Sequence, residues 1–433
     1  MMRLTKYPEL GGLERTISSF DCFHAHSLPL CAAENVMSEF VKLPLAADFQ
    51  ERYIMGSAYD YSNEDNFIGS VFLLPFYQQI TTLCAELFHA RYADVRTLTG
   101  MNCLCTIAMA LMQPGERVMI LDKEWGGHAS VAPTLERLGL EVFYAPYCRD
   151  VYDFDYERLN RETDEYGIDY LMLAPSDIIF PMDLKRVDTS SLTLLYDASQ
   201  LLGLIAAGLV ANPLDDMTNC VVFGGTHKTM PGPAHGLILT NEERIFEKLD
   251  KNINPKYLRN TQMHQVVSLL FTLIEMKYFG LAYQANTVRS ALRLGEALEA
   301  EGFTLAKKGN EYTRTHQLFI ECSRECMSLM FRHAQKENIT CNTKKKALFH
   351  GGFGVRLGLQ EVSRYNWDNE ALSTVSAILK NIASNEYNST SVRKMMSSLP
   401  PKTIYFTFER EHYETLAALL ACMQVPPPSS LSL

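Results

Sequence analysis

The chain has 433 residues and a formal net charge of −10, with 47% hydrophobic and 21% charged residues. This composition is typical of a water-soluble globular protein large enough for two or three domains. The acidic balance argues against a general surface for nucleic acid or for an anionic membrane. The sequence contains no apolar run of about 18 residues, so no membrane-spanning helix is expected.

Eleven cysteines are scattered along the chain without a C-x-x-C pair. Because the N-terminus also lacks an apolar signal segment, these cysteines are expected to be free thiols in a reducing cytoplasm. Histidines and cysteines do not cluster at the spacing of zinc ligands, so no metal site is expected.

Short apolar strands alternate with helices through the first half of the chain. Residues 1–65 are expected to form an N-terminal arm and an aromatic active-site loop, and helical periodicity follows over 66–92. The expected order is then a strand and turn at 94–100, helix 101–113, strand 117–122, helix 128–138, strand 140–146, helix 155–166, and strands 169–174, 192–197, 220–224 and 236–240. This alternation indicates a mostly parallel sheet covered by helices, with ligands at the carboxyl ends of its strands.

The second half is expected to begin with helices over 242–310, including one long amphipathic stretch at about 264–300. A smaller α+β unit follows, with strands at 317–321, 339–342 and 354–358 and helices at 323–336 and 368–384. The predicted fold class is therefore α/β. Its parts are the arm and loop at 1–65, a large sheet domain at 66–265, a connecting helix at 266–310 and a small C-terminal α+β domain at 311–425.

Two strands of the large domain end on residues that can carry chemistry. An apolar strand at 221–223 leads through two glycines to Lys228, and the strand at 192–197 ends on Asp197. Taken singly, a surface lysine and a capping aspartate would be the more common interpretations. Together, an acid at one strand end and a lysine about thirty residues later indicate a pyridoxal-phosphate site. The lysine would form a Schiff base, and the acid would keep the pyridine nitrogen protonated.

Other strand ends carry residues with two interpretations. Thr99 and Gly100 open a helix whose backbone N–H groups could bind phosphate, or they form an ordinary helix cap. His128 could stack on a pyridine ring or simply begin a helix near solvent. Arg356, between apolar residues of a short strand, suits a carboxylate, although an ordinary surface arginine has the same pattern. The three lysines at 344–346 are expected in a solvated loop.

Several motifs resemble those of serine hydroxymethyltransferases. They are Ala32-Ala-Glu-Asn, Gly126-Gly-His, Asp197-Ala-Ser-Gln-Leu-Leu-Gly, Thr226-His-Lys-Thr-Met-Pro-Gly-Pro and Gly354-Val-Arg-Leu-Gly. Their order and spacing agree with the family from about residue 30 to residue 385, and the Thr-His-Lys element is the most specific of them. The resemblance implies pyridoxal 5'-phosphate, the large fold of aspartate aminotransferase, and a homodimer with shared active sites.

Carried over residue by residue, the resemblance assigns roles to these positions. Lys228 would be the Schiff-base lysine, Asp197 would pair with the pyridine nitrogen, and His128 would stack on the ring. Arg356 would bind the carboxylate of the amino acid. The cofactor would also be contacted by Thr99, Gly100, Met101, Ser176, Ser199, Gln200, Thr226 and His227, and the substrate by Glu34, Tyr53, Met55, Tyr59 and Tyr61. Among the loop tyrosines, Tyr53 would be the phenolic proton donor.

The departures from the family lie mainly on its folate side. Where the family has a glutamate that moves a proton in the folate-dependent reaction, the alignment places Met55, whose thioether cannot do so. The alignment has a gap here, so Glu64 or Asp60 are alternative substitutes. A family serine that contacts the substrate carboxylate is Ala33, and a family histidine is Gln200, which cannot titrate.

The sequence therefore predicts a folate-independent enzyme that acts on the Cα–Cβ bond of a β-hydroxy amino acid such as threonine or serine. Retro-aldol cleavage would release an aldehyde and leave a glycine quinonoid, which is protonated or attacks a second aldehyde, as in an aldolase or a transaldolase. The loop tyrosines would shape the aldehyde pocket, or would simply pack. Three alternatives stay open: a folate-dependent hydroxymethyltransferase acting on serine or α-methylserine, other pyridoxal-phosphate chemistry such as transamination, and a non-catalytic protein on the same scaffold.

Overall fold

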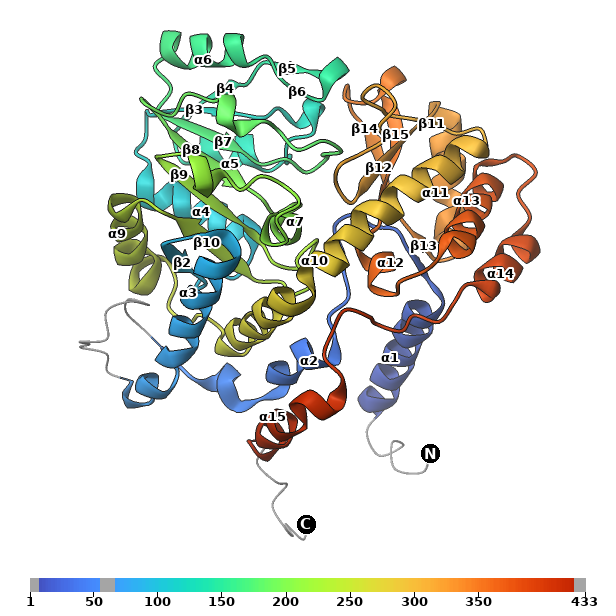
Figure 1. The fold of residues 1–433 in the computed structure, drawn as a ribbon, viewed down its shortest axis with the longest axis horizontal. Helices are drawn as coiled ribbons and strands as arrows, with labels where there is room; N and C mark the ends of the chain where they lie inside the picture. The colour runs from blue at the N-terminus through green and yellow to red at the C-terminus, as the bar shows by residue number, and fades with distance from the viewer. Residues whose placement is uncertain (1–7, 55–66, 424–433) are drawn as a thin grey trace.

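The structure is a computed structural model that describes residues 8–54 and 67–423. Its large part is built on a seven-stranded sheet of order β2-β10-β9-β8-β7-β3-β4 (Figure 1). The strands are β2 (Tyr92–Asp94), β3 (Arg117–Ile120), β4 (Glu141–Tyr144), β7 (Tyr170–Leu173), β8 (Thr193–Asp197), β9 (Cys220–Gly225) and β10 (Gly236–Thr240). β10 runs antiparallel to β2 and β9, and every other neighbouring pair in this sheet is parallel. The predicted mostly parallel sheet and α/β class are therefore confirmed.

The strands are apolar on both sides because helices cover both faces of the sheet. In β9, Val222 packs in the core on the side of α3 (Leu74–Phe88) and α10 (Met263–Ala300), whereas Val221 and Phe223 pack in the core on the side of α4 (Gly100–Leu111). This alternation follows from the two-residue period of a strand. The helices of this part are α3 (Leu74–Phe88), α4 (Gly100–Leu111), α5 (Val131–Arg137), α6 (Tyr156–Glu165), α7 (Leu202–Ala206), α8 (Pro213–Asp216) and α9 (Glu243–Asn252).

A helix of 38 residues, α10 (Met263–Ala300), runs from the large sheet to the C-terminal part (Figure 1). There an antiparallel sheet has the order β11-β12-β15-β14, with strands β11 (Thr304–Leu305), β12 (Gln317–Glu321), β14 (Asn342–Lys345) and β15 (Phe353–Gly358). The helices that follow α10 are α11 (Arg324–Lys336), α12 (Gln360–Arg364), α13 (Asn369–Ala383), α14 (Ser389–Ser398) and α15 (Arg410–Cys422). The domain boundaries expected from the sequence remain a prediction.

The N-terminal segment differs from the irregular arm that the sequence suggests. It begins with α1 (Pro8–His26), a helix of 19 residues. The next residues form β1 (Leu28–Pro29), which pairs in parallel with β13 (Ile339–Thr340). Beyond β1 the backbone passes so close to the end of β15 that a Cβ on Gly358 would lie 2.3 Å from Cα of Ala32. This contact places residues 31–35 at the end of β15, and Asn35 reaches the loop after β9, where its Nδ2 donates to the carbonyl of Lys228.

By length and composition alone, two helical segments, 68–88 and 263–300, could cross a membrane, which the sequence expectation did not include. In the longer one, α10, 67% of the most apolar window is buried within the fold. That helix packs against α3 of the large part and α13 of the small part. Its apolar surface is therefore explained by contacts within the protein.

Candidate active site

A cavity of about 330 Å³ lies where β8 and β9 end at their carboxyl termini. This is the general position of ligand sites in open α/β sheets. Every residue that the sequence proposes for the cofactor lines this cavity, with the exception of Thr226. Thr226 is fully buried and donates a hydrogen bond from Oγ1 to the carbonyl of Pro233 at 2.7 Å, so it shapes the loop that follows β9.

Lys228 lies in that loop and lines the cavity. Burial lowers the pKa of its ammonium group, and Asp197 only partly offsets this effect. A larger fraction of the amine is then unprotonated near neutral pH, which is the form that attacks a carbonyl carbon. The backbone of the loop is held by Asn35, whose Nδ2 donates to the carbonyl of Lys228 at 2.5 Å and to Tyr283 Oη at 2.8 Å.

Asn35 belongs to the Ala32-Ala-Glu-Asn motif, but the sequence did not single it out as a site residue. We expect Asn35→Ala to lower the free energy of unfolding by about 1–3 kcal/mol, because the buried carbonyl of Lys228 loses this donor. We also expect kcat to fall by roughly tenfold to a hundredfold, because the lysine is then less well positioned. Urea unfolding and steady-state kinetics measure the two effects.

Asn35→Asp is a second variant, because it keeps the acceptor that binds the backbone N–H of Val36 and replaces the donor by a charged carboxylate oxygen that faces the carbonyl of Lys228. It should reproduce most of the loss in kcat. If both variants retain full activity, Asn35 does not position Lys228.

Asp197 is the last residue of β8, and its carboxylate is oriented by a local network. Oδ1 accepts hydrogen bonds from the backbone N–H of Ser199 at 2.8 Å and from its hydroxyl group. The same hydroxyl accepts from the backbone N–H of Gly225 at 2.8 Å, which ties the ends of β8 and β9 together. Oδ1 is thereby fixed, and the carboxylate borders the cavity in one orientation.

His128 also lines the cavity, and it follows two glycines directly. Gly126 has φ of +101°, and a Cβ on Gly127 would lie 2.1 Å from the carbonyl oxygen of Leu121, so neither position tolerates a side chain. The turn is closed by the backbone N–H of His128, which donates to the carbonyl of Ala174 at 2.9 Å. Burial lowers the pKa of His128, so the ring is predominantly neutral at pH 7 and suits stacking.

One end of the cavity has the character of a phosphate site. The N-terminus of α4 lies there, capped by Thr99, whose hydroxyl accepts from the backbone N–H of Asn102 at 3.0 Å. Gly100 must be glycine, since a Cβ would lie 2.7 Å from the backbone nitrogen of Gly225. Nδ1 of His227 is buried and has no hydrogen-bond partner among the described residues. Backbone donors at a helix N-terminus beside an unpaired imidazole nitrogen match an incoming phosphate.

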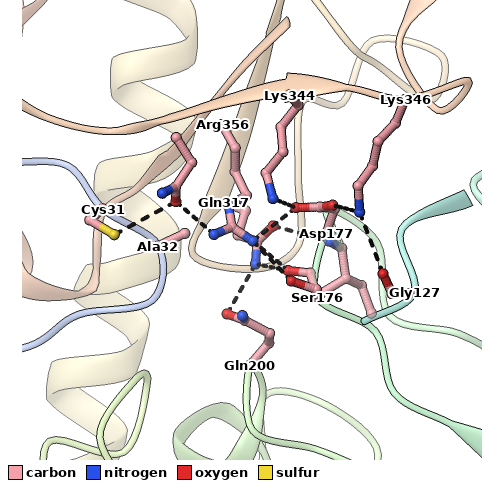
Figure 2. Close-up of polar contacts among 12 residues, drawn as sticks. Cys31, Ala32, Gly127, Ser176, Asp177, Gln200, Gln317, Lys344, Lys346 and Arg356 are labelled. Atoms are coloured by element: carbon pink, nitrogen blue, oxygen red, sulfur yellow. Dashed lines mark hydrogen bonds and ion pairs between the residues drawn. The ribbon is translucent and has the colours of Figure 1, made fainter. Parts of the chain in front are cut away.

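Arg356 lies on β15 in contact with Ser176, which lines the cavity, and is only 3% exposed, so the surface interpretation is wrong (Figure 2). Its Nη1 donates at 2.8 Å both to the carbonyl of Ser176 and to Oδ1 of Asp177. Its Nη2 donates to Asn342 Oδ1 at 2.6 Å, and its buried Nε has no partner within the described structure. The guanidinium group is therefore buried and fixed, and it keeps one free donor.

The lysines at 344–346 were expected in a solvated loop, and for two of them this is wrong. Lys344 Nζ lies 2.7 Å from Oδ1 of Asp177, and Lys346 Nζ lies 2.6 Å from its Oδ2 (Figure 2). Burial by itself raises the pKa of Asp177, but Arg356 and the two lysines outweigh it and lower the pKa. Asp177 is thus a buried carboxylate that three cations surround.

The side chain of Gln200 contacts two residues, His316 and Gln317, that the sequence analysis did not predict to be near the site. Its Oε1 accepts from Gln317 Nε2 at 3.1 Å and lies 3.1 Å from Nε2 of His316. Burial lowers the pKa of His316 to about 3, so this histidine stays neutral. His316 and Gln317 come from the start of β12 in the C-terminal part, and no local motif marks them.

The proposed substrate residues outside β15 are placed less favourably. Glu34 is exposed and lines a separate cavity with Cys31 and Asn342. Tyr53 is 43% exposed, stacks on Phe67 at 5.1 Å between ring centroids, and lines a third cavity, so within one chain it is not beside Lys228. Met55, Tyr59 and Tyr61 lie outside the described residues.

The cavity fits the expected cofactor. A nucleophilic amine at Lys228, an oriented carboxylate at Asp197 and a neutral ring at His128 all border it. A phosphate would meet the start of α4 and the unpaired nitrogen of His227. These are the groups that pyridoxal phosphate needs: a Schiff-base lysine, a partner for its ring nitrogen and a phosphate cradle.

Comparisons with known proteins show which family this chain resembles. A family model described as serine hydroxymethyltransferase matches residues 19–379. The chain is 31% identical over 402 residues to the serine hydroxymethyltransferase of Methanocella arvoryzae, covering 89% of this chain and 93% of that protein. It is 28% identical over 386 residues to that of Sulfolobus acidocaldarius, covering 86% and 87%.

A solved structure of L-threonine transaldolase from Pseudomonas fluorescens, in its internal aldimine state, superposes with a TM-score of 0.87. The superposition covers 98% of this chain and 99% of that chain, at 22% sequence identity. At this identity the likeness establishes a shared fold.

Proposed function

The chain belongs to the serine hydroxymethyltransferase family, and we propose that it catalyses a folate-independent aldol reaction on a β-hydroxy amino acid. Family membership makes it a pyridoxal-phosphate-dependent enzyme that acts at the Cα–Cβ bond of a serine- or threonine-like substrate. In the proposed reaction, that bond is cleaved to release an aldehyde, and the remaining glycine unit is protonated or joined to a second aldehyde.

Three side chains of the protein, those of Lys228, Asp197 and Arg356, would have separate roles in this reaction. When bound, pyridoxal phosphate supplies an electron sink for negative charge at Cα. Lys228 Nζ would hold the cofactor at its carbonyl carbon, and as a free amine it would be a base close to Cα of the substrate. Asp197, whose position is fixed by hydrogen bonds from Ser199, would keep a proton on the pyridine nitrogen. The free Nε of Arg356 is available to orient the carboxylate of the amino acid.

The observation that carries folate independence is Met55, at the position where the family has a proton-transferring glutamate. A thioether neither donates nor accepts a proton at neutral pH, so this position cannot perform that step. The connection between β14 and β15 adds support, because the resemblance aligns it with a folate-side loop that is usually longer in the family. It is closed onto the turn at 123–127, because the backbone N–H of Leu348 donates to the carbonyl of Glu124 at 3.0 Å and Lys346 Nζ donates to the carbonyl of Gly127 at 3.4 Å.

The test uses purified holoenzyme freed of folate. Threonine and a second aldehyde, such as benzaldehyde, are mixed with the enzyme, and amino acids and aldehydes are separated by chromatography. We expect acetaldehyde release and a new β-hydroxy amino acid without tetrahydrofolate. Serine is assayed in parallel with and without tetrahydrofolate. If glycine forms from serine only when tetrahydrofolate is present, and threonine is inert, the enzyme is a folate-dependent hydroxymethyltransferase. Keto acid formed from an amino donor would instead indicate transamination.

We further propose that the enzyme is a cytoplasmic homodimer with shared active sites. Apolar side chains on α1 and on the turn at Ile68–Phe72 face solvent in a single chain: Phe20 is 63% exposed, Phe72 79% and Ile68 91%. A second copy would cover such side chains. It would also bring its own Tyr53, which lies next to this turn, toward the partner's cavity.

Light scattering should give a mass of twice 49.0 kDa for the wild-type protein. We expect the double variant Ile68→Asp, Phe72→Asp to be monomeric, because charged groups cannot be buried unpaired in an apolar interface. The monomer should lose most activity if the sites are shared. A fully active monomer would contradict shared sites, and a wild-type monomer would contradict the dimer.

A further inference from the structure

We propose that Lys344 and Lys346 form a second anion subsite beside the cofactor cavity, and that the substrate's side chain carries a carboxylate or a phosphate. This inference rests on the proposed function, because it names the substrate class of the same site. The amino-acid carboxylate would bind at Arg356, and the second anionic group would bind at the two lysines. Neutral amino acids such as threonine would then be poorer substrates than acidic ones.

The charges around Asp177 do not balance. Lys344, Lys346 and Arg356 all lie within ion-pair distance of its carboxylate, at 2.7, 2.6 and 2.8 Å. Over the described part of the chain, neither lysine has a second carboxylate at that distance. Three positive groups therefore face one negative group, in a chain whose formal net charge is −10. A general basic character of the protein cannot explain this local excess.

Such an excess of positive charge is unfavourable in a buried site unless a further anion neutralises it. Taking an ammonium group out of water costs several kcal/mol, and one carboxylate cannot compensate three cations. In agreement, the pKa of Lys344 is lowered to about 8, first by burial and also by repulsion from Arg356 and Lys346. The two lysine side chains remain 14% and 16% exposed, whereas that of Asp177 is fully buried. An incoming anion can therefore reach the lysines, while Asp177 lies behind them.

The cluster lies next to residues that line the cavity or adjoin its lining. Arg356 binds the carbonyl of Ser176, a residue of the cavity wall, at 2.8 Å. Lys346 binds the carbonyl of Gly127, the residue before His128. Figure 2 shows Arg356 and the two lysines converging on Asp177 from the same side. Because one guanidinium group is sufficient for one carboxylate, the two lysines correspond to an additional anionic group.

Lys345 provides a control within the same strand. Side chains of an extended segment alternate between two faces, so Lys344 in β14 and Lys346 directly after it turn toward Asp177, while Lys345 turns away and is exposed. It has the same charge and nearly the same place in the sequence. A non-specific effect of lysine charge would therefore be the same for all three positions, whereas a subsite would distinguish Lys345 from the other two.

Isothermal titration calorimetry of the holoenzyme tests the subsite with matched pairs of amino acids. One pair is 3-hydroxyaspartate and threonine; the other is 4-hydroxythreonine 4-phosphate and 4-hydroxythreonine. We expect the wild type to prefer the anionic member of at least one pair. Lys344→Met and Lys346→Met should each lower that preference by roughly tenfold, the effect of one lost charge-assisted hydrogen bond. Lys345→Met should leave the preference unchanged.

Asp177→Asn gives a change of opposite sign, because removing the internal carboxylate frees cationic groups and should strengthen binding of the anionic member. Far-ultraviolet circular dichroism and urea unfolding establish that each variant folds, and Lys344→Gln replaces Lys344→Met if that variant does not. A preference for 3-hydroxyaspartate identifies a carboxylate, and one for the phosphate compound identifies a phosphate.

Three results would overturn the subsite: no preference in the wild type, an equal loss in the Lys345 variant, or no loss in the Lys344 and Lys346 variants. If threonine binds and only the preference is missing, the substrate class is wrong and the proposed function stands. If neither threonine nor any of the other three compounds binds, both are wrong.

Discussion

Lys228→Ala is expected to lower kcat by about 10²–10⁴-fold, because the variant loses both the nucleophilic amine and the base near Cα. The structure gives the amine a lowered pKa through burial. Its backbone is fixed by the hydrogen bond from Asn35 to its carbonyl at 2.5 Å. Lys228 is the only lysine among the described residues that line the cavity, and the nearby Lys344 and Lys346 are paired with Asp177.

Two measurements separate chemistry from binding in this variant. The imine absorbance of the wild-type holoenzyme, and its removal by borohydride, should be absent in Lys228→Ala. Peptide mapping of the reduced wild-type protein should find the cofactor on Lys228. Lys345→Ala, at an exposed lysine, is the matched control and should keep full absorbance and activity. A Lys228→Ala protein that retained the absorbance would show that another amine holds the cofactor.

The residues found from the sequence are those whose surroundings are local. Asp197 and Lys228 each follow a short apolar strand, and in a parallel sheet neighbouring strands end at the same edge. Thr99 and Gly100 likewise follow a strand and begin a helix. Because strand, turn and helix signals all lie within a few residues of these positions, the pattern alone brings them to one cavity.

The residues that were misjudged depend on contacts between distant parts of the chain. Three consecutive lysines are typical of a solvated loop, and nothing near them in the sequence indicates Asp177. Only the pairing of β14 with β15, and the docking of this sheet beside the end of β7, brings Lys344 and Lys346 to that carboxylate. His316 reaches Gln200 for the same reason.

The N-terminal segment shows a third case. Leu13, Ile17 and Phe20 recur at helical spacing, yet α1 leaves them exposed in the single chain. A solvent-exposed apolar stripe has no partner within one copy to reveal its purpose, and neither does the turn at Ile68–Phe72. Local pattern therefore could not predict what these surfaces contact, which is why the dimer is a proposal.

Asp197→Asn is expected to lower kcat by about 10²–10³-fold, the usual loss when one oriented electrostatic partner of a reacting system is removed. Asparagine has the same shape and can still accept the hydrogen bond from the backbone N–H of Ser199. It cannot keep a proton on the pyridine nitrogen by charge. The free energy of unfolding should therefore change little, while the rate of Cα–Cβ cleavage falls.

Ser199→Ala is the control. In contrast to Asp197→Asn, it should lower the free energy of unfolding more than it lowers kcat. It leaves the charge of Asp197 intact but removes the hydroxyl that accepts from the buried backbone N–H of Gly225. Leaving that donor unpaired costs about 1–3 kcal/mol of folding free energy, so stability should fall more than kcat. If Asp197→Asn instead retained kcat within about tenfold of the wild type, charge at the pyridine nitrogen would contribute less than about 1.4 kcal/mol to catalysis. In that case Asp197 and Lys228 would line the same cavity, but only Lys228 would contribute to catalysis.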